Sequence, residues 1–205
     1  MHGLLLLRHA QSTWNAARRW QGWADPPLSE EGMQQVAVAA ERLAEEEPFD
    51  LVVTSDLLRA RHTADLLLAA LGSAAERAVE PGLREHDVAG WSGLGFAEVE
   101  ARWPGDVDRM RRGEQPLGGG EPRGVFDARV AAAGRRTAAA AAVRGARRLL
   151  VIAHGGVLNS LARSAGRAEH RVGHLAGYRG RHGDGGLVPL LPVDLLEPLT
   201  AREPA

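Results

Sequence analysis

Three short apolar runs have the pattern of strands that are buried on both faces. They span residues 3–7 and the segments DLVVTS at 50–55 and RLLVIA at 148–153, and the last two are rich in β-branched residues. A continuous apolar run of this length, without alternation of polar residues, is typical of a strand covered on both sides. We therefore predict three central strands at these positions.

Apolar residues at helical spacing fill the segments between and after these runs. The clearest helix lies in LSEEGMQQVAVAAERLAEEE, where Ser29 is the expected N-cap. A second helix is predicted from Ser55 or Asp56 to position 71, because Gly72 suits the left-handed residue that ends many helices. Weaker patterns predict further helices near 95–103, over 123–146 and in GGVLNSLARSAG at 155–166.

The order of these elements predicts the fold class. A strand followed by a helix and another strand implies parallel pairing. The segment from about 83 to 121 is rich in glycine, tryptophan and charge, and the tail at 186–199 is expected to add one or two edge strands, where its prolines are tolerated. We predict one α/β domain over residues 1–205, with three α/β/α layers, a mostly parallel central sheet and a small cap-like excursion at 83–121.

Composition narrows the classes of partner. The net charge is -1 and all 25 basic residues are arginine, which we attribute to the codon bias of a GC-rich genome. A chain with this charge balance has no overall positive electrostatic potential that would attract polyanions, so we expect no nucleic-acid partner. The absence of cysteine excludes disulfides, thiolate catalysis and cysteine-ligated zinc. No apolar segment has the length of a signal-peptide core or membrane span, so we predict a cytoplasmic protein without a membrane partner.

Polar residues that carry chemistry follow each predicted strand. In parallel sheets the ligand crevice lies beyond the carboxyl ends of the strands. Arg8 and His9 follow the first strand, Arg59 lies one turn after the second, and His154 follows the third. A cation in the first helical turn, as expected for Arg59, is disfavoured by the helix dipole, and such a local conflict often marks a functional site. Two arginines and a helix N-terminus together suit a phosphate dianion.

A histidine beside these arginines can act as a nucleophile toward phosphorus. Neighbouring positive charge lowers the pKa of His9 and keeps its imidazole unprotonated. The leaving alkoxide then needs a proton. Glu85, in LREHDVAGWSG, is our candidate for the acid because it follows a short apolar element, and its rivals are Asp87 and Glu98.

Five motifs in order resemble one known family over most of the chain. LRHAQSTWN, QGWADPPLSEEG, SDLLRARHTA, LREHDVAGWSG and VIAHGGVLNSL are similar to the signature segments of the histidine phosphatase superfamily, in its phosphoglycerate mutase-like branch. The resemblance implies that His9 is the nucleophile, Glu85 the general acid, and Arg8, Arg59 and His154 ligands of the phosphoryl group. It also implies substrate-binding roles for Asn15, Gln21, Gly22 and Gly155.

Three positions depart from the family pattern. Ala10 replaces the usual glycine after the nucleophile, Ser92 stands where a glutamate is frequent, and Pro122 stands where a serine often follows GE. The first change adds one methyl group at a tight turn. The changes at Ser92 and Pro122 do not alter the catalytic residues, but they affect the substrate contacts and the subfamily that the resemblance would imply.

The resemblance leads us to predict a metal-independent phosphomonoesterase without a cofactor, acting on a small sugar phosphate or phosphoglycerate-type ester. A phosphoglycerate mutase is the first alternative. Glu85 and His154 are only 69 positions apart, whereas family mutases usually carry a longer insertion there, which favours the phosphatase. A non-catalytic module that binds phosphorylated ligands is the second alternative. The resemblance leaves a homodimer open.

Other groups of residues allow either a structural or a functional interpretation. His170 and His174 have the spacing of two metal ligands on a helix, but HRVGH contains a glycine and lacks the glutamate of a zincin helix, so we predict no metal site. GGGE at 118–121 is interpreted as a flexible loop, because no lysine follows it. Two sets remain open between substrate contact and an ordinary packing or surface role: the arginines Arg109, Arg111 and Arg112, and the tryptophans Trp14, Trp20, Trp23, Trp91 and Trp103.

Overall fold

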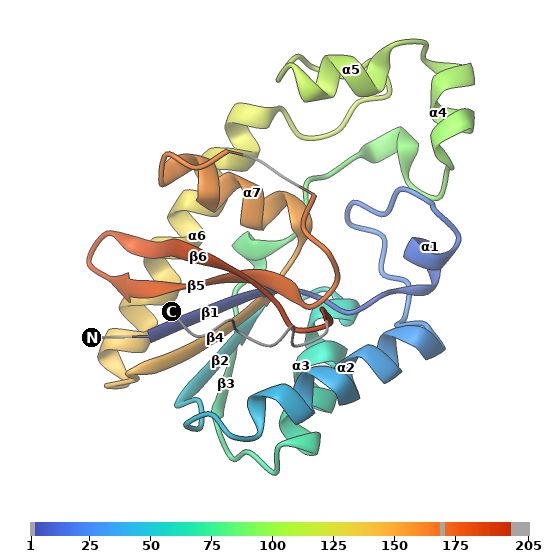
Figure 1. Cartoon of the computed structure of the whole chain (residues 1–205). Coiled ribbons are helices and arrows are strands. Elements are labelled where there is room, and N and C mark those ends of the chain that lie inside the picture. The colour runs from blue at the N-terminus through green and yellow to red at the C-terminus, as the bar shows by residue number, and fades with distance from the viewer. Residues whose placement is uncertain (1–2, 169–170, 198–205) are drawn as a thin grey trace, which may run out of the picture.

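A six-stranded sheet forms the centre of the computed structural model, which describes residues 3–168 and 171–197 (Figure 1). The strand order is β3-β2-β4-β1-β5-β6. Parallel pairings join the first four strands in this order, and antiparallel pairings add the last two, which confirms the predicted mostly parallel sheet. The strands are β1 (Gly3–Arg8), β2 (Leu51–Thr54), β3 (Glu76–Val79), β4 (Arg148–Ala153), β5 (Ala176–Gly183) and β6 (Gly186–Asp194).

Helices cover both faces of this sheet. Helices α2 (Glu30–Leu43) and α3 (Leu58–Ala70) lie on one face, and α6 (Arg123–Val143) and α7 (Gly155–Ser164) lie on the other (Figure 1). Successive side chains of β1 point to opposite faces, so Leu5 joins the cluster under α2 and α3 while Leu6 joins the cluster under α6 and α7. Burial of β1 on both faces explains its continuous apolar sequence, and the three-layer α/β/α prediction is confirmed.

Two strands carry no apolar run and were not predicted. β3 has the sequence ERAV and an exposed outer face, because it is the short edge strand next to β2. β5, AGYRGRHG, pairs antiparallel with both β1 and β6, and its glycines and arginines conceal the strand pattern. β6 is the one described edge strand within the predicted tail segment; positions 198 and 199 of that segment lie outside the described residues.

Helix α3 begins later than the predicted Ser55 or Asp56, with Leu57 as its N-cap. Both polar residues have partners elsewhere. The Ser55 hydroxyl lies 2.7 Å from His154 Nε2, and Asp56 accepts a hydrogen bond from Arg84 Nε at 2.7 Å. The carboxylate of Asp25 instead accepts a hydrogen bond from the Leu58 amide at 2.6 Å. A capping group from a distant segment cannot be inferred from the local sequence.

The element η1 (Pro81–Leu83) leads into the predicted excursion of residues 83–121. The excursion itself contains η2 (Ala89–Trp91), α4 (Phe96–Arg102) and α5 (Asp106–Arg111), over the carboxyl ends of the strands. Helix α4 agrees with the weak pattern near 95–103, whereas α5 was not predicted. A small apolar cluster of its own holds this segment, centred on Trp91 and Val99. Figure 1 shows α4 and α5 standing away from the sheet, beyond α7 and the short helix α1 (Thr13–Ala16). None of the described helices is long and apolar enough to cross a membrane.

Candidate active site

The predicted convergence of strand ends is present in the structure. β1 lies next to β4, and β4 lies next to β2, so their carboxyl ends meet at one edge of the sheet. There His9 follows β1 and His154 follows β4, and the centroids of the two rings are 5.2 Å apart. The His9 amide donates to the Ala153 carbonyl at 3.0 Å, which continues the sheet pairing up to the nucleophile candidate. The parallel register thus places both histidines.

The orientation of the His9 ring leaves one nitrogen available for chemistry. Its Nδ1 lies 2.6 Å from the Ala10 carbonyl oxygen, which can only accept a hydrogen bond. Nδ1 therefore carries the proton, and Nε2 keeps its lone pair. Burial lowers the pKa of His9 well below its ordinary value of 6.5, and the neighbouring His154, Arg59 and Arg8 lower it further. The predicted direction of this shift is confirmed, although burial is its largest cause.

His154 is the N-cap residue of α7 and is fully buried. Its Nε2 lies 2.7 Å from the Ser55 hydroxyl, at the end of β2. Burial lowers its pKa well below 6.5, and Arg59 and Arg8 act in the same direction. The contact with Ser55 fixes the ring where strands β1, β4 and β2 end, and gives the Ser55 side chain a role that the sequence did not indicate.

Backbone carbonyl groups hold the side chains of Arg8 and Arg59 at the site. Arg8 Nη1 donates to the Val172 carbonyl at 2.8 Å, and Arg59 donates to the carbonyls of Ala24 at 2.7 Å and Gly22 at 2.9 Å. Burial lowers the pKa of both guanidinium groups, for Arg59 to about 10, so Arg59 stays charged at neutral pH. The Nε atom of each is buried without a hydrogen-bond partner among the described residues. Each arginine therefore retains a donor for an anion.

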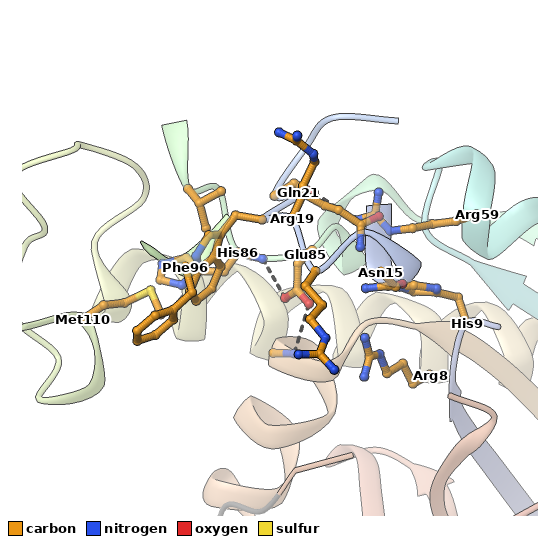
Figure 2. A pocket seen from close by; sticks show the side chains of 15 residues that line it. Arg8, His9, Asn15, Arg19, Gln21, Arg59, Glu85, His86, Phe96 and Met110 are labelled. Carbon is orange, nitrogen blue, oxygen red and sulfur yellow. Dashed lines mark hydrogen bonds between the residues drawn. The ribbon is translucent and has the colours of Figure 1, made fainter. Parts of the chain in front are cut away.

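Glu85 is held by backbone amides at the same cavity. Its Oε1 accepts a hydrogen bond from the His86 amide at 2.8 Å and its Oε2 from the Gly156 amide at 3.2 Å (Figure 2). A Cβ atom at position 156 would lie 2.3 Å from Glu85 Oε1, so only glycine allows this approach. The rivals Asp87 and Glu98 do not line the cavity, and they accept hydrogen bonds from the amides of Ala89 and Gly95 instead.

Helix α1 and the loop after it bring Asn15, Gln21 and Gly22 to the cavity. Ser12 organises it: its hydroxyl lies 2.8 Å from Gln21 Oε1, and its amide donates to Asn15 Oδ1 at 3.2 Å. Because Oδ1 of Asn15 is engaged, its amide nitrogen is left to face the cavity. Gly22 has φ +52°, and a side chain there would meet the Val88 amide at 2.9 Å. These three predicted residues do lie together with His9.

The resulting cavity has a volume of about 430 Å³ and is lined by Arg8, His9, Arg59 and Glu85 at its polar end. Figure 2 shows Arg8, His9, Asn15 and Arg59 at one end, Phe96 and Met110 at the other, and Glu85 between them. This volume is within the usual range for small-molecule sites. Gly156 lines the cavity, whereas the predicted Gly155 does not; the latter instead lies beside the Arg8 side chain, because α7 turns its second residue toward Glu85.

Several residues at the site carried no signal in the sequence. His174 lies on the segment after α7, where its ring centroid is 6.1 Å from that of His9, and burial with Arg8 and Arg171 lowers its pKa to about 3. His170, which stands at metal-ligand spacing from His174 in the sequence although no metal site was predicted, lies outside the described residues. Besides Gly156, the lining residues that were not predicted are Arg18, Arg19, His86, Val88, Phe96 and Met110. All come from loops or short helices, where no periodicity indicates which side chain faces inward.

The two sets of residues left open by the sequence have different outcomes. Arg109, Arg111 and Arg112 do not line the cavity and form ion pairs with acids of their own segment, so they are not placed to meet a ligand there. Among the tryptophans, only Trp20 lines the cavity. Trp91 and Trp103 belong to the apolar cluster of the excursion, and Trp23 donates a hydrogen bond to the Glu85 carbonyl at 2.8 Å.

Comparisons with known proteins give matches over most of the chain. The model of the histidine phosphatase superfamily (branch 1) matches residues 4–175. A 2,3-bisphosphoglycerate-dependent phosphoglycerate mutase of Methylobacterium sp. (strain 4-46) is 39% identical over 162 residues, covering 77% of each chain. A mycobacterial glucosyl-3-phosphoglycerate phosphatase, solved with VO3, superposes with a TM-score of 0.76 at 29% identity, covering 94% of this chain and 98% of that one. A phosphoglycerate mutase from Bacillus anthracis, at 22% identity and a TM-score of 0.80, covering 94% and 93%, shares the fold.

Proposed function

Because the chain belongs to branch 1 of the histidine phosphatase superfamily, we propose that it is a metal-independent phosphomonoesterase acting through a phosphohistidine at His9. Family membership itself makes the chain an enzyme with phosphatase or mutase activity. The observation that carries the proposal is one cavity lined by the imidazole of His9, the guanidinium groups of Arg8 and Arg59, and the carboxyl group of Glu85. The substrate is a small phosphorylated metabolite, a sugar phosphate or a phosphoglycerate-type ester.

The first half of the reaction transfers the phosphoryl group to His9. The lone pair on Nε2 attacks phosphorus, the bond from phosphorus to the ester oxygen breaks, and Glu85 gives its proton to the leaving oxygen. Arg8, Arg59 and His154 bind the phosphoryl oxygens and stabilise the charge of the transition state. The Ala10 carbonyl, which accepts from His9 Nδ1, stabilises the positive charge that the ring acquires as Nε2 bonds to phosphorus.

The second half returns the site to its starting state. The carboxylate of Glu85 takes a proton from water, the water oxygen attacks phosphorus, and the bond from phosphorus to Nε2 breaks. Inorganic phosphate leaves, and both His9 and Glu85 regain their initial protonation. The same carboxyl group thus serves as acid and then as base.

Access of water to the cavity supports hydrolysis over mutase activity. Phe96 at the far wall is 53% exposed, and the lining residues Arg18 and Arg19 are also exposed, so the cavity opens to solvent. The shortness of the segment between Glu85 and His154 is weaker support than the sequence suggested. The Methylobacterium relative named as a mutase aligns over 77% of both chains, so the two have nearly equal lengths. That relative keeps a mutase as the second candidate.

The experiment is a comparison of phosphate release and isomerisation under one set of conditions. The full chain is incubated in chelator with a panel of phosphate monoesters that includes sugar phosphates and 3-phosphoglycerate. Inorganic phosphate is measured, and conversion of 3- to 2-phosphoglycerate is followed with and without 2,3-bisphosphoglycerate. An alkaline quench of the reaction with labelled ester then detects acid-labile phosphohistidine.

We expect phosphate release without isomerisation, and label that is lost in the His9→Gln variant. Isomerisation that exceeds phosphate release would instead assign the mutase. Full turnover by His9→Gln with an unchanged circular dichroism spectrum would contradict the nucleophile assignment. Neither turnover nor label with any ester would favour the non-catalytic binding module.

A further inference from the structure

The cavity holds more positive charge than a phosphate ester alone would balance. Among the described residues, four arginines line it and Glu85 is its one acidic residue. Arg8 and Arg59 lie next to His9 and are assigned to the phosphoryl group. Arg19 is held by the excursion, since its Nη1 donates to the Gly93 carbonyl and lies 3.8 Å from Glu98 Oε2. Arg18 remains as a cation whose partner has not been named.

The side chain of Arg18 has no hydrogen-bond or ion-pair partner among residues 3–168 and 171–197, and it is exposed at the cavity. Its backbone is left-handed, with φ 54°, a conformation that costs free energy for any residue except glycine. The turn is fixed on both sides, because the Arg18 amide donates to the Asn15 carbonyl at 3.0 Å and the Arg19 amide to the Trp14 carbonyl at 2.9 Å. A strained, unpartnered arginine therefore stands at the rim of the site.

The far wall of the cavity is apolar. Phe96 and Met110 come from α4 and α5 of the excursion, and Val88 and Trp20 also line the cavity. Figure 2 shows Glu85 between this wall and the group formed by Arg8, His9 and Arg59. Because Glu85 is assigned to protonate the leaving oxygen, the alcohol part of the substrate extends from Glu85 toward this wall and the rim.

We propose that Arg18 forms a subsite for a second anionic group, a carboxylate or a phosphate, on the alcohol part of the phosphate ester. This inference rests on the proposed function and adds the class of substrate. A planar guanidinium can donate two hydrogen bonds to either anion, which selects it over a neutral hydroxyl group. Bound at the rim, the second anion neutralises the positive charge of Arg18, which the phosphoryl group does not contact.

Matched pairs of esters test the subsite. The carboxylate pair is 3-phosphoglycerate and glycerol 3-phosphate, and the phosphate pair is propane-1,3-diol bisphosphate and its monophosphate. We expect the wild-type chain to show a higher kcat/KM for the anionic member of at least one pair, and the pair with the larger ratio identifies the group. Arg18→Gln is expected to lower kcat/KM for that member about tenfold, the scale of one hydrogen bond between charged groups, and to change the neutral member less than about twofold.

Two further variants separate charge from geometry and from general surface effects. Arg18→Lys keeps the charge but not the planar fork, so an intermediate loss is expected. Arg77→Gln removes an exposed arginine of β3 that is paired with Asp65 and should leave every ratio unchanged. An equal effect of Arg18→Gln on both members of each pair, or loss of the preference in Arg77→Gln alone, would overturn the subsite.

Binding in the absence of turnover distinguishes this inference from the proposed function. The same pairs are titrated calorimetrically into the His9→Gln variant, with and without Arg18→Gln. Tighter binding of the anionic member, lost on removal of Arg18, supports the subsite even where the wild-type chain releases no phosphate. Equal affinities within both pairs would overturn it even where hydrolysis is observed.

Discussion

The guanidinium group of Arg59 has two tasks at the residue scale. Its terminal nitrogens donate to the carbonyls of Gly22 and Ala24, which fixes the loop that carries Gln21. Its Nε is buried, has no hydrogen-bond partner in the described part of the chain, and is available to a phosphoryl oxygen. Desolvation of this cation is unfavourable, as its pKa of about 10 shows, so the loop contacts and the bound anion together compensate for its burial.

Replacement of Arg59 by lysine is therefore expected to affect both tasks. A lysine ammonium keeps the charge but cannot bridge two carbonyls and also present a planar donor to phosphate. Each charge-assisted hydrogen bond contributes about 1.5–3 kcal/mol, so kcat/KM should fall by about 10- to 100-fold and the free energy of unfolding by about 1–2 kcal/mol. Steady-state kinetics and urea unfolding measure the two effects. Arg61→Lys, at an exposed position of the same helix, is the control and should change neither; equal effects of the two variants would contradict this account.

The residues nearest the chemistry could be predicted because they follow strands. His9 and His154 stand at the ends of apolar runs, and the parallel register brings such positions together in any fold of this class. Ser55, Arg18 and His174 could not be predicted in the same way. Their places depend on a neighbouring strand, a strained turn and a long connection, none of which leaves a local pattern.

At the scale of whole elements, α6 fixes the segment that carries the general acid. Arg129 of this helix donates to the carbonyls of Gly82 at 2.9 Å, Arg84 at 3.0 Å and Glu85 at 3.2 Å. It also forms a two-point ion pair with Glu121, at 2.8 and 2.6 Å, where the excursion returns to the helix. One side chain thus joins both ends of the excursion to the rigid core, and we infer that it is a positioning residue for Glu85.

Arg129→Lys tests this role. Lysine cannot reach all of these acceptors, so the Glu85 carboxyl group should lose its fixed orientation toward the leaving oxygen. We expect kcat to fall about tenfold while KM stays within about twofold, because the phosphoryl ligands do not touch Arg129. Arg136→Lys is the matched control on the same helix, where the exposed Arg136 side chain pairs with Glu80 and not with the site. A rise in KM with unchanged kcat would show that Arg129 acts on binding instead.

The sequence predicts elements well where burial is two-sided. The central strands and the helices over them repeat the predicted order, since each must bury an apolar face on a neighbour. β3 and β5 were missed because edge and antiparallel strands need bury only one face or neither. The start of α3 was misplaced because Ser55 serves His154 in place of capping its own helix. Tertiary contacts, which the local sequence pattern does not reveal, therefore determine β3, β5 and the start of α3.

At the scale of the whole molecule, a cluster of neutral histidines at the site links catalysis to stability. His9, His154 and His174 all have pKa values lowered from 6.5, chiefly by burial, and for His174 the value is about 3. The unfolded chain binds protons at these residues as the pH falls below about 6.5, whereas the folded chain does not. The unfolded state therefore gains stability relative to the folded state under acid conditions.

The free energy of unfolding should accordingly decrease as the pH falls from 7.5 to 5.5. Each histidine contributes about 1.4 kcal/mol over this range, so the three together account for up to about 4 kcal/mol. The paired carboxyl groups with lowered pKa values, such as those of Glu46 and Asp106, lose their contribution only at lower pH, because their ordinary values are 4.5 and 3.8. Urea unfolding at pH 7.5, 6.5 and 5.5 measures how the free energy of unfolding depends on pH.

The His174→Asn variant tests the contribution of one of the three groups. It should reduce the total decrease by about a third. A decrease of the same size in this variant, or no decrease in the wild-type chain, would refute the account.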